Sequence, residues 1–131
     1  MWAAGSIPLA VAAAKRAGGF STKVEVEARS LDEALAAARA GADVVMLDNY
    51  ATPAALAADA AALKAAAPHV LVEASGGVTA ATLAAYCLPG IDVVSVGRLT
   101  CGYGTADFSL KLAKGDGVAG IAKALAAKPP A

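Results

Sequence analysis

Acidic residues lie at the ends of two apolar segments in this 131-residue sequence. Glu27 ends the segment KVEVE, and Asp48 lies near the end of the segment VVMLDN. An ionised carboxylate that ends a buried strand is costly to desolvate unless it binds something. Two such groups on neighbouring strands can hold two hydroxyls of a ribose, or Mg²⁺ directly or through water. We therefore predict that Glu27 and Asp48 bind substrate and metal, while the alternative role for Asp48 is to cap the next helix.

Glycine-rich segments follow the next two apolar segments. Ser75, Gly76 and Gly77 follow VLVEA, and Gly97 and Arg98 end the segment IDVVSVGR. Glycine lets backbone N–H groups approach an anion, and the start of a following helix would add a positive dipole. Paired glycine loops after successive strands are the usual phosphate cup of barrel enzymes. We predict a phosphate site at these glycines, with Arg98 either reaching the phosphate or lying on the surface.

The secondary structure must bring these groups together. Apolar segments that alternate with alanine-rich segments are typical of parallel βα units, whose chemistry gathers at the carboxyl ends of the strands. The sequence predicts strands at 22–27, 43–48, 70–74 and 92–96, with a short fifth strand at 107–112. Helices are predicted at 6–17, 30–40, 52–67, 79–89 and 118–127, and Ser30 with Glu33 matches a capping box.

The predicted fold class is α/β, with parallel βα repeats forming part of an open TIM-like barrel. The strands recur roughly every 21 to 27 residues, which is the period of a βα unit. A complete barrel takes about 250 residues or somewhat fewer, so this chain holds about half of one. We assign residues 1–112 to the partial barrel and residues 113–131 to a terminal helix and a frayed tail.

The first strand has one charged face. Because side chains alternate along a strand, Lys23, Glu25 and Glu27 share one face, and Val24 and Val26 share the other. Three charged side chains beneath helices would be costly to desolvate, so we expect the charged face to line the barrel interior. A purely structural interpretation pairs Lys23 with Glu25, and Glu27 is then best placed for a ligand.

Composition excludes some classes of function. Lys plus Arg and Asp plus Glu number 11 each, so the net charge gives no sign of a nucleic-acid or membrane partner. Cys87 and Cys101 form no CxxC pair, and we expect two buried or half-buried thiols in a reducing cytosol. The apolar N-terminus lacks the early positive charge of a signal peptide and is predicted to be a core helix. These features predict a cytoplasmic protein.

The motifs KVEVE, AGADVVMLDN, VEASGGV and IDVVSVGRLT, followed by DFSLKL, resemble the C-terminal part of quinolinate phosphoribosyltransferases, the carboxylating nicotinate-nucleotide pyrophosphorylases. The resemblance extends from about Ala3 to Leu112. It implies an enzyme that transfers phosphoribose from phosphoribosyl pyrophosphate to quinolinate, with Mg²⁺ as cofactor. The products would be nicotinate mononucleotide, pyrophosphate and CO₂, in de novo NAD biosynthesis.

The same resemblance implies roles for matching residues. Glu27 and Asp48 would contact the ribose hydroxyls and the Mg²⁺-diphosphate region. They would also be catalytic, because nearby carboxylates stabilise the positive charge of an oxocarbenium-like transition state. Ser75, Gly76, Gly77 and Gly97 would bind the 5-phosphate.

The resemblance also implies what this chain lacks. In the family, the groups that grip quinolinate precede the part that this chain matches, and a homodimer completes the site. We therefore expect a truncated chain with little or no activity alone. The segment 101–105 departs from the family sequence, so its role is open. The alternatives are another phosphate-binding barrel transferase acting on a different base, and a non-catalytic partner of a full-length homologue.

Overall fold

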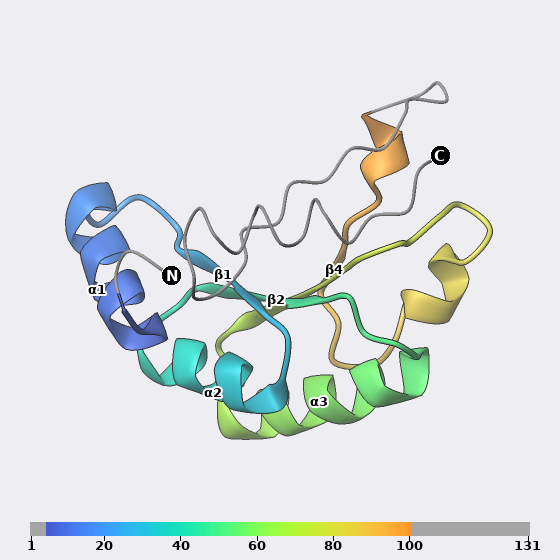
Figure 1. Cartoon of the computed structure of the whole chain (residues 1–131), viewed down its shortest axis with the longest axis horizontal. Coiled ribbons are helices and arrows are strands. Elements are labelled where there is room, and N and C mark those ends of the chain that lie inside the picture. Colours follow the sequence, from blue (N-terminus) through green and yellow to red (C-terminus); the bar gives the residue numbers. More distant parts are fainter. Residues whose placement is uncertain (1–4, 101–131) are drawn as a thin grey trace, which may run out of the picture.

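The computed structural model describes residues 5–100 as a parallel sheet with helices along one side (Figure 1). Its strands lie in the order β1-β2-β3-β4, so each strand pairs with the next one along the chain. This arrangement confirms the α/β class and the parallel βα repeats of a partial barrel. The elements are α1 (Ile7–Gly18), β1 (Glu25–Ala28), α2 (Leu31–Arg39), β2 (Val44–Asp48), α3 (Pro53–Ala66), β3 (Leu71–Ser75), η1 (Leu83–Tyr86), β4 (Val93–Val94) and η2 (Gly97–Leu99).

Side-chain caps begin the three α-helices where the sequence predicts them. The hydroxyl oxygens of Ser6 and Thr52 accept hydrogen bonds from backbone N–H groups three residues later, at 3.4 and 3.2 Å. Ser30 does the same for the N–H of Glu33 at 3.3 Å. The Glu33 carboxylate accepts from the N–H of Arg29 at 2.9 Å instead of completing the capping box at Ser30. The predicted helix start is therefore confirmed, but the Glu33 carboxylate caps the N–H of Arg29 rather than that of Ser30.

The fourth βα unit differs from the prediction. The helix predicted at 79–89 is wrong, because the structure has only the four-residue 3₁₀ helix η1 in that range. The hydroxyl of Thr82 accepts from the N–H of Thr79 at 2.9 Å, and the two hydroxyl oxygens lie 3.1 Å apart. Such local side-chain bonds compete with helical hydrogen bonds and favour a turn. The predicted strand 92–96 is also shorter, with β4 limited to Val93–Val94.

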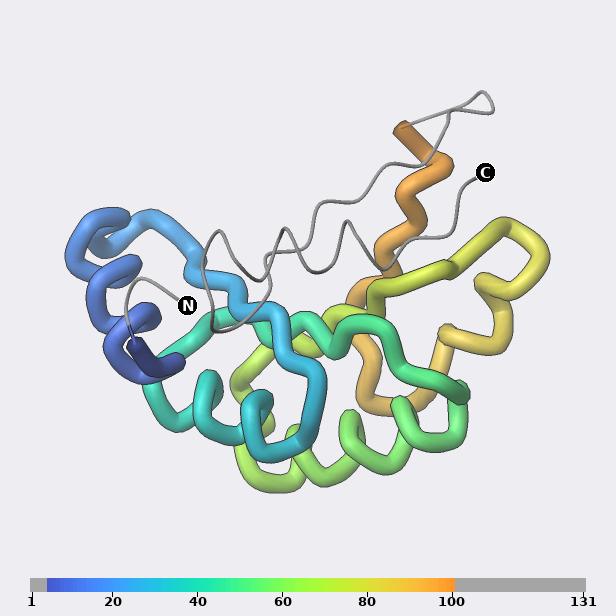
Figure 2. Tube along the Cα trace, viewed as in Figure 1, coloured from blue at the N-terminus to red at the C-terminus, as the bar shows by residue number. Residues whose placement is uncertain are grey.

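The core lies between the helices and one face of the sheet. Val45 and Leu47 of β2 and Val72 and Ala74 of β3 are 0% exposed on that face. Small alanines of α2 and α3 let these helices approach the strands closely, and the buried ones are Ala34, Ala37, Ala38 and Ala60. The chain trace shows the helices following the curve of the strands on their outer side (Figure 2). The sheet therefore has a sealed outer face and an opposite, inner face.

The inner face carries the polar side chains. Glu25 and Glu27 of β1 are exposed, while Val24 is buried and Val26 is half-buried on the helix side. The predicted orientation of this strand is therefore confirmed. On β2 and β3 the inner positions are half-buried or exposed, with Leu71 43% exposed.

Some predictions fall on other parts of the chain. The predicted fifth strand, the terminal helix and Cys101 lie outside the described residues, so the division at residue 112 stays a prediction. Cys87 is exposed, and the expectation of a buried or half-buried thiol is wrong for it. Its thiol lies at the end of η1 and donates to the carbonyl of Leu83 at 3.5 Å. Within residues 5–100, no helix is both long enough and apolar enough to cross a membrane.

Candidate functional site

Strand register brings the predicted site residues to one edge of the sheet. Asp48 of β2 pairs directly with Ser75 of β3, and Glu27 of β1 pairs with Met46, two residues before Asp48. The N–H of Ser95 donates to the carbonyl of Ala74 at 2.9 Å, which extends the β3–β4 pairing. Because the strands are parallel, their carboxyl ends share one edge. That edge therefore carries Glu27, Asp48, Ser75, Gly76, Gly77 and Gly97, as the sequence predicted.

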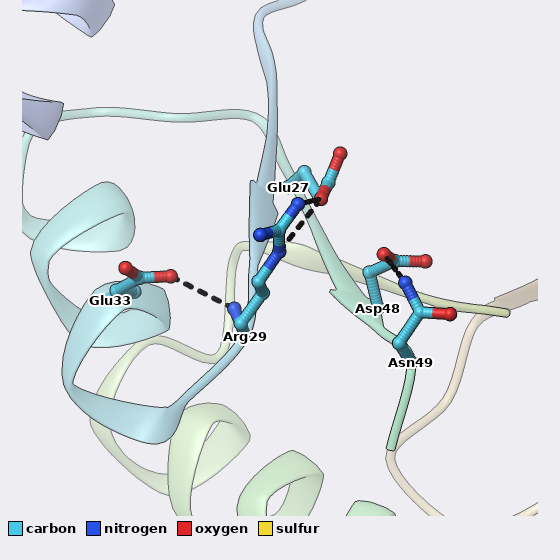
Figure 3. A network of polar contacts seen from close by, with 5 residues as sticks. All are labelled: Glu27, Arg29, Glu33, Asp48 and Asn49. Carbon is cyan, nitrogen blue, oxygen red and sulfur yellow. Dashed lines mark hydrogen bonds and ion pairs between the residues drawn. The ribbon is translucent and has the colours of Figure 1, made fainter. Parts of the chain in front are cut away.

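Glu27 and Asp48 lie near each other at this edge, close enough for their carboxylates to interact electrostatically, and we call them the acidic pair (Figure 3). Partial burial raises the pKa of Asp48, and the neighbouring Glu27 carboxylate raises it further. Strand alternation would place Asn49 on the opposite face, but its backbone adopts a φ of 57° and leaves the strand. Its side-chain amide consequently donates to the Asp48 carboxylate. Asn49 thus belongs to the acidic pair rather than to the helix side.

Arg29 also belongs to this cluster, although the sequence analysis missed it. Its Nε and Nη2 donate to Oε1 of Glu27 at 3.2 and 2.9 Å (Figure 3). Arg29 follows Glu27 by two residues, and strand alternation places residues with that spacing on the same face. The two-residue spacing could therefore have predicted that Arg29 lies beside Glu27. Within residues 5–100, Arg29 is the cation that forms an ion pair with a member of the acidic pair.

The three glycines differ in what the fold requires of them. Gly76 has a φ of 101°, and a Cβ there would lie 2.7 Å from the backbone nitrogen of Asn49. Gly77 has a φ of 64° with open space around it. Gly97 has neither a positive φ nor any atom within 4 Å of an added Cβ. The fold itself explains glycine at 76 and 77, whereas at Gly97 it leaves room for a ligand.

Backbone N–H groups are available at the predicted phosphate site. Across the described range, the N–H groups of Gly76 and Gly77 have no hydrogen-bond acceptor within the protein. The expected contribution from a following helix is wrong, because only a short 3₁₀ turn follows, starting at Leu83. An anion at this position would therefore be bound by peptide N–H groups and the Ser75 hydroxyl, without a helix dipole.

A second acidic pair lies deeper on the inner face. The pKa of Glu25 is raised by partial burial and by the nearby Glu73 carboxylate. The hydroxyl of Ser95 donates to Glu73. Lys23 and Glu25 form no ion pair with each other, so that structural interpretation is wrong. These contacts indicate that Glu73 orders the interior beneath the site.

The acidic pair suits one kind of metal site. Among the described residues, no group of three or more His, Cys, Asp or Glu side chains is arranged to hold a metal ion. Mg²⁺ usually keeps several waters and binds one or two carboxylates together with substrate phosphates. Glu27 and Asp48 fit a Mg²⁺ ion that arrives with a phosphorylated substrate, and they do not fit a cage made of protein alone.

Comparisons with known proteins identify the family. Residues 1–111 match the sequence model of the quinolinate phosphoribosyl transferase C-terminal domain. The carboxylating nicotinate-nucleotide pyrophosphorylase of Rattus norvegicus is 57% identical over 115 residues, covering 87% of this chain and 38% of that protein. The Homo sapiens enzyme of the same name is 54% identical over 110 residues, covering 84% of this chain and 37% of that protein.

Solved structures extend the similarity to the fold. The nicotinate-nucleotide pyrophosphorylase from Francisella tularensis superposes with a TM-score of 0.64 at 36% identity. The superposition covers 76% of this chain and 34% of that one. The chain therefore spans less than two fifths of the length of these relatives.

Proposed function

Because the chain belongs to the quinolinate phosphoribosyl transferase family and corresponds to its C-terminal domain, we propose that it forms the phosphoribose-binding part of such an enzyme. The reaction would transfer phosphoribose from phosphoribosyl pyrophosphate to quinolinate, giving nicotinate mononucleotide, pyrophosphate and CO₂ for NAD biosynthesis. One observation carries the proposal: an acidic pair and unpaired glycine N–H groups share a single sheet edge.

The two kinds of group would bind opposite ends of the ribose. We assign Glu27 and Asp48 to the ribose hydroxyls, since ionised carboxylates accept hydrogen bonds from hydroxyls. The N–H groups of Gly76 and Gly77, the Ser75 hydroxyl and the backbone at Gly97 would bind the 5-phosphate. This arrangement would fix the ribose between the acids and the phosphate cup.

The acids would also serve the chemistry. As the bond to the diphosphate breaks, positive charge develops on the ribose, and two fixed carboxylates beside it would stabilise that charge. Mg²⁺ bound with the donor would neutralise diphosphate charge and so favour its departure. Glu27 and Asp48 are the residues that would hold this ion, directly or through water.

The acceptor places a limit on the isolated chain. Quinolinate is a dianion, and Arg29, the described cation beside the acids, is already paired with Glu27. We therefore propose that the 131-residue chain binds ribose phosphate but turns over little quinolinate alone. A homodimer or higher homo-oligomer of the full-length protein, implied by the family resemblance, belongs to the same proposal, as does the cytoplasmic location expected from the sequence.

Calorimetric titration of ribose 5-phosphate into the purified chain tests the proposal. We expect Gly97→Ala to weaken binding about tenfold, because the methyl group would fill the space left for the phosphate. The same variant should melt at the wild-type temperature, since its Cβ meets no protein atom within 4 Å. Unchanged binding by Gly97→Ala, or no binding by the wild-type chain, would contradict the assignment.

A further inference from the structure

We propose that Arg29 is a positioning residue of the donor site, which holds one carboxylate oxygen of Glu27 and leaves the other free for the ribose. The inference rests on the proposed function and adds a residue to it. It concerns how the Glu27 side chain is held before a ligand arrives.

The geometry of the pair is asymmetric. Nε and Nη2 of Arg29 both donate to Oε1 of Glu27, and neither donates to Oε2 (Figure 3). The second carboxylate oxygen therefore accepts no hydrogen bond from Arg29 and stays available on the side of Asp48. Arg29 itself is anchored at the backbone, because its N–H donates to the Glu33 carboxylate at 2.9 Å. The guanidinium thus extends from a fixed point at the start of α2 to the end of β1.

Stability does not explain this ion pair. The Arg29 side chain is 74% exposed and that of Glu27 is 47% exposed. Ion pairs with this exposure contribute little to folding, because water screens them and both side chains lose rotamer freedom. A glutamate held in one rotamer, however, has less entropy left to lose when a ligand binds. The pair is therefore better explained by preorganisation of Glu27 than by folding.

Charge at the site supports the same role. The Arg29 guanidinium also acts electrostatically on the carboxylates of Asp48 and Glu33. Without it, Glu27 and Asp48 would repel each other with less compensation, and Glu27 would turn away from Asp48 towards solvent. Arg29 therefore keeps the two acids together at the edge where the ribose would bind.

A direct contact between Arg29 and the donor diphosphate is the competing interpretation. Ribose 5-phosphate separates the two, because it has the hydroxyls that Glu27 would bind but no diphosphate. If Arg29 acts through Glu27, its removal must weaken ribose 5-phosphate binding, and only while Glu27 is present. A double-mutant cycle measures this dependence.

The experiment is calorimetric titration of ribose 5-phosphate into the wild-type chain, Arg29→Gln, Glu27→Gln and the double variant. We expect Arg29→Gln to weaken binding about fivefold in the wild-type background and not at all in the Glu27→Gln background. Arg29→Lys should restore part of the loss, since it keeps the charge but not the two-nitrogen contact. Arg39→Gln, an exposed arginine at the end of α2, is the matched control and should bind as wild type.

Specificity provides a second readout that a merely structural role would not change. The wild-type chain should bind ribose 5-phosphate more tightly than 2-deoxyribose 5-phosphate, and Arg29→Gln should reduce that ratio. Equal losses in both Glu27 backgrounds, or wild-type affinity and selectivity in Arg29→Gln, would overturn the inference alone. A wild-type chain that binds neither sugar phosphate would overturn the proposed function and this inference together.

Discussion

The two edges of the sheet use acidic residues in opposite ways. At the amino edge, Asp43 accepts hydrogen bonds from Lys15 at 2.5 Å and from the N–H of Val24 at 2.7 Å. At the carboxyl edge, Asp48 lies beside another carboxylate, Glu27. The amino-edge acid joins a helix to two strands, whereas the carboxyl-edge acid is left with incomplete compensation. This contrast supports a structural role for the amino edge and the proposed binding role for the carboxyl edge.

The amino-edge contact occurs twice. Asp92 accepts from Lys64 at 2.5 Å and from the N–H of Val72 at 2.7 Å, which repeats the Lys15–Asp43 arrangement. The sequence G-x-D-V-V around Asp43 recurs around Asp92, 49 residues later. Each clamp ties a helix to the beginnings of neighbouring strands. The repeated motif was therefore a readable structural signal, although it carries no chemistry of its own.

The pKa directions follow the same division. At the amino edge, the lysine and backbone donors lower the pKa of Asp43 and of Asp92. At the carboxyl edge, partial burial and a neighbouring carboxylate raise the pKa of Asp48. Deeper on the inner face, the same two causes raise the pKa of Glu25. Ionisation of Asp43 and Asp92 at the amino edge thus stabilises the fold, whereas ionisation of Asp48 and Glu25 on the inner face and carboxyl edge destabilises it. Carboxylates whose pKa is shifted in this way are often found at functional sites.

The largest expected effect on stability comes from a substitution in the core, between the two edges of the sheet. Leu47 of β2 is 0% exposed in the core, so Leu47→Ala should lower the free energy of unfolding by about 2–5 kcal/mol. Urea denaturation followed by circular dichroism measures this loss. Leu9→Ala, at a position 61% exposed on α1, is the control. A loss at Leu47 no larger than at Leu9 would mean that the sheet does not pack on its helices as described.

An amino-edge clamp should have the next largest effect. Asp43→Ala leaves the Lys15 ammonium and the Val24 N–H without this acceptor, and should destabilise the fold by about 1–3 kcal/mol. Asp92→Ala should behave similarly. Chemical denaturation of both variants tests the prediction. If either variant matched the wild-type stability, the clamps would have no structural role.

The pH dependence of stability should separate the clamp acids of the amino edge from the acids whose pKa is raised. Groups with a lowered pKa, Asp43 and Asp92, contribute stability above about pH 4, and this stability is lost as the pH falls through their folded values. Groups with a raised pKa, Glu25 and Asp48, favour the fold below their unfolded values, and that contribution is lost as the pH rises through their folded values.

Melting temperatures between pH 3 and pH 7 therefore test the signs. Asp43→Asn should weaken the fall in stability on the acidic side, while Asp48→Asn should remove a loss on the neutral side. A steeper acid dependence in Asp43→Asn would contradict the assigned direction.

The smallest effect should come from the deeper acidic pair. Glu25→Gln removes repulsion with Glu73, and we expect it to stabilise the fold by roughly half a kcal/mol or less at pH 7, because Glu25 is exposed. Thermal melts beside Asp32→Asn, an exposed acid of α2, provide the comparison. Destabilisation by Glu25→Gln would show that Glu25 has a favourable partner instead.

Local chemistry explains what the sequence could predict. Helix starts depend on neighbours in the chain, so Ser6, Ser30 and Thr52 identified them correctly. Strand ends could be aligned because parallel βα units place them at one edge. The helix predicted at 79–89 failed because the Thr79–Thr82 contacts favour a turn over an alanine-rich helix.

Other features depend on contacts that sequence patterns do not specify. Asp43 lies 28 residues from Lys15, and nothing local in the sequence pairs them. Gly76 illustrates a different limit, because a glycine needed for close packing against Asn49 has the same sequence signature as one that approaches a phosphate. Gly97 differs from Gly76, because neither a positive φ nor close packing in the fold requires glycine there.

The most direct test of the contrast compares Asp48→Asn with Asp43→Asn, by titration with ribose 5-phosphate and by urea denaturation of the same samples. We predict that Asp48→Asn weakens binding about tenfold with equal or higher stability, while Asp43→Asn loses stability and binds as wild type. Wild-type binding by Asp48→Asn, or weakened binding by a fully stable Asp43→Asn, would contradict the division between a binding edge and a structural edge.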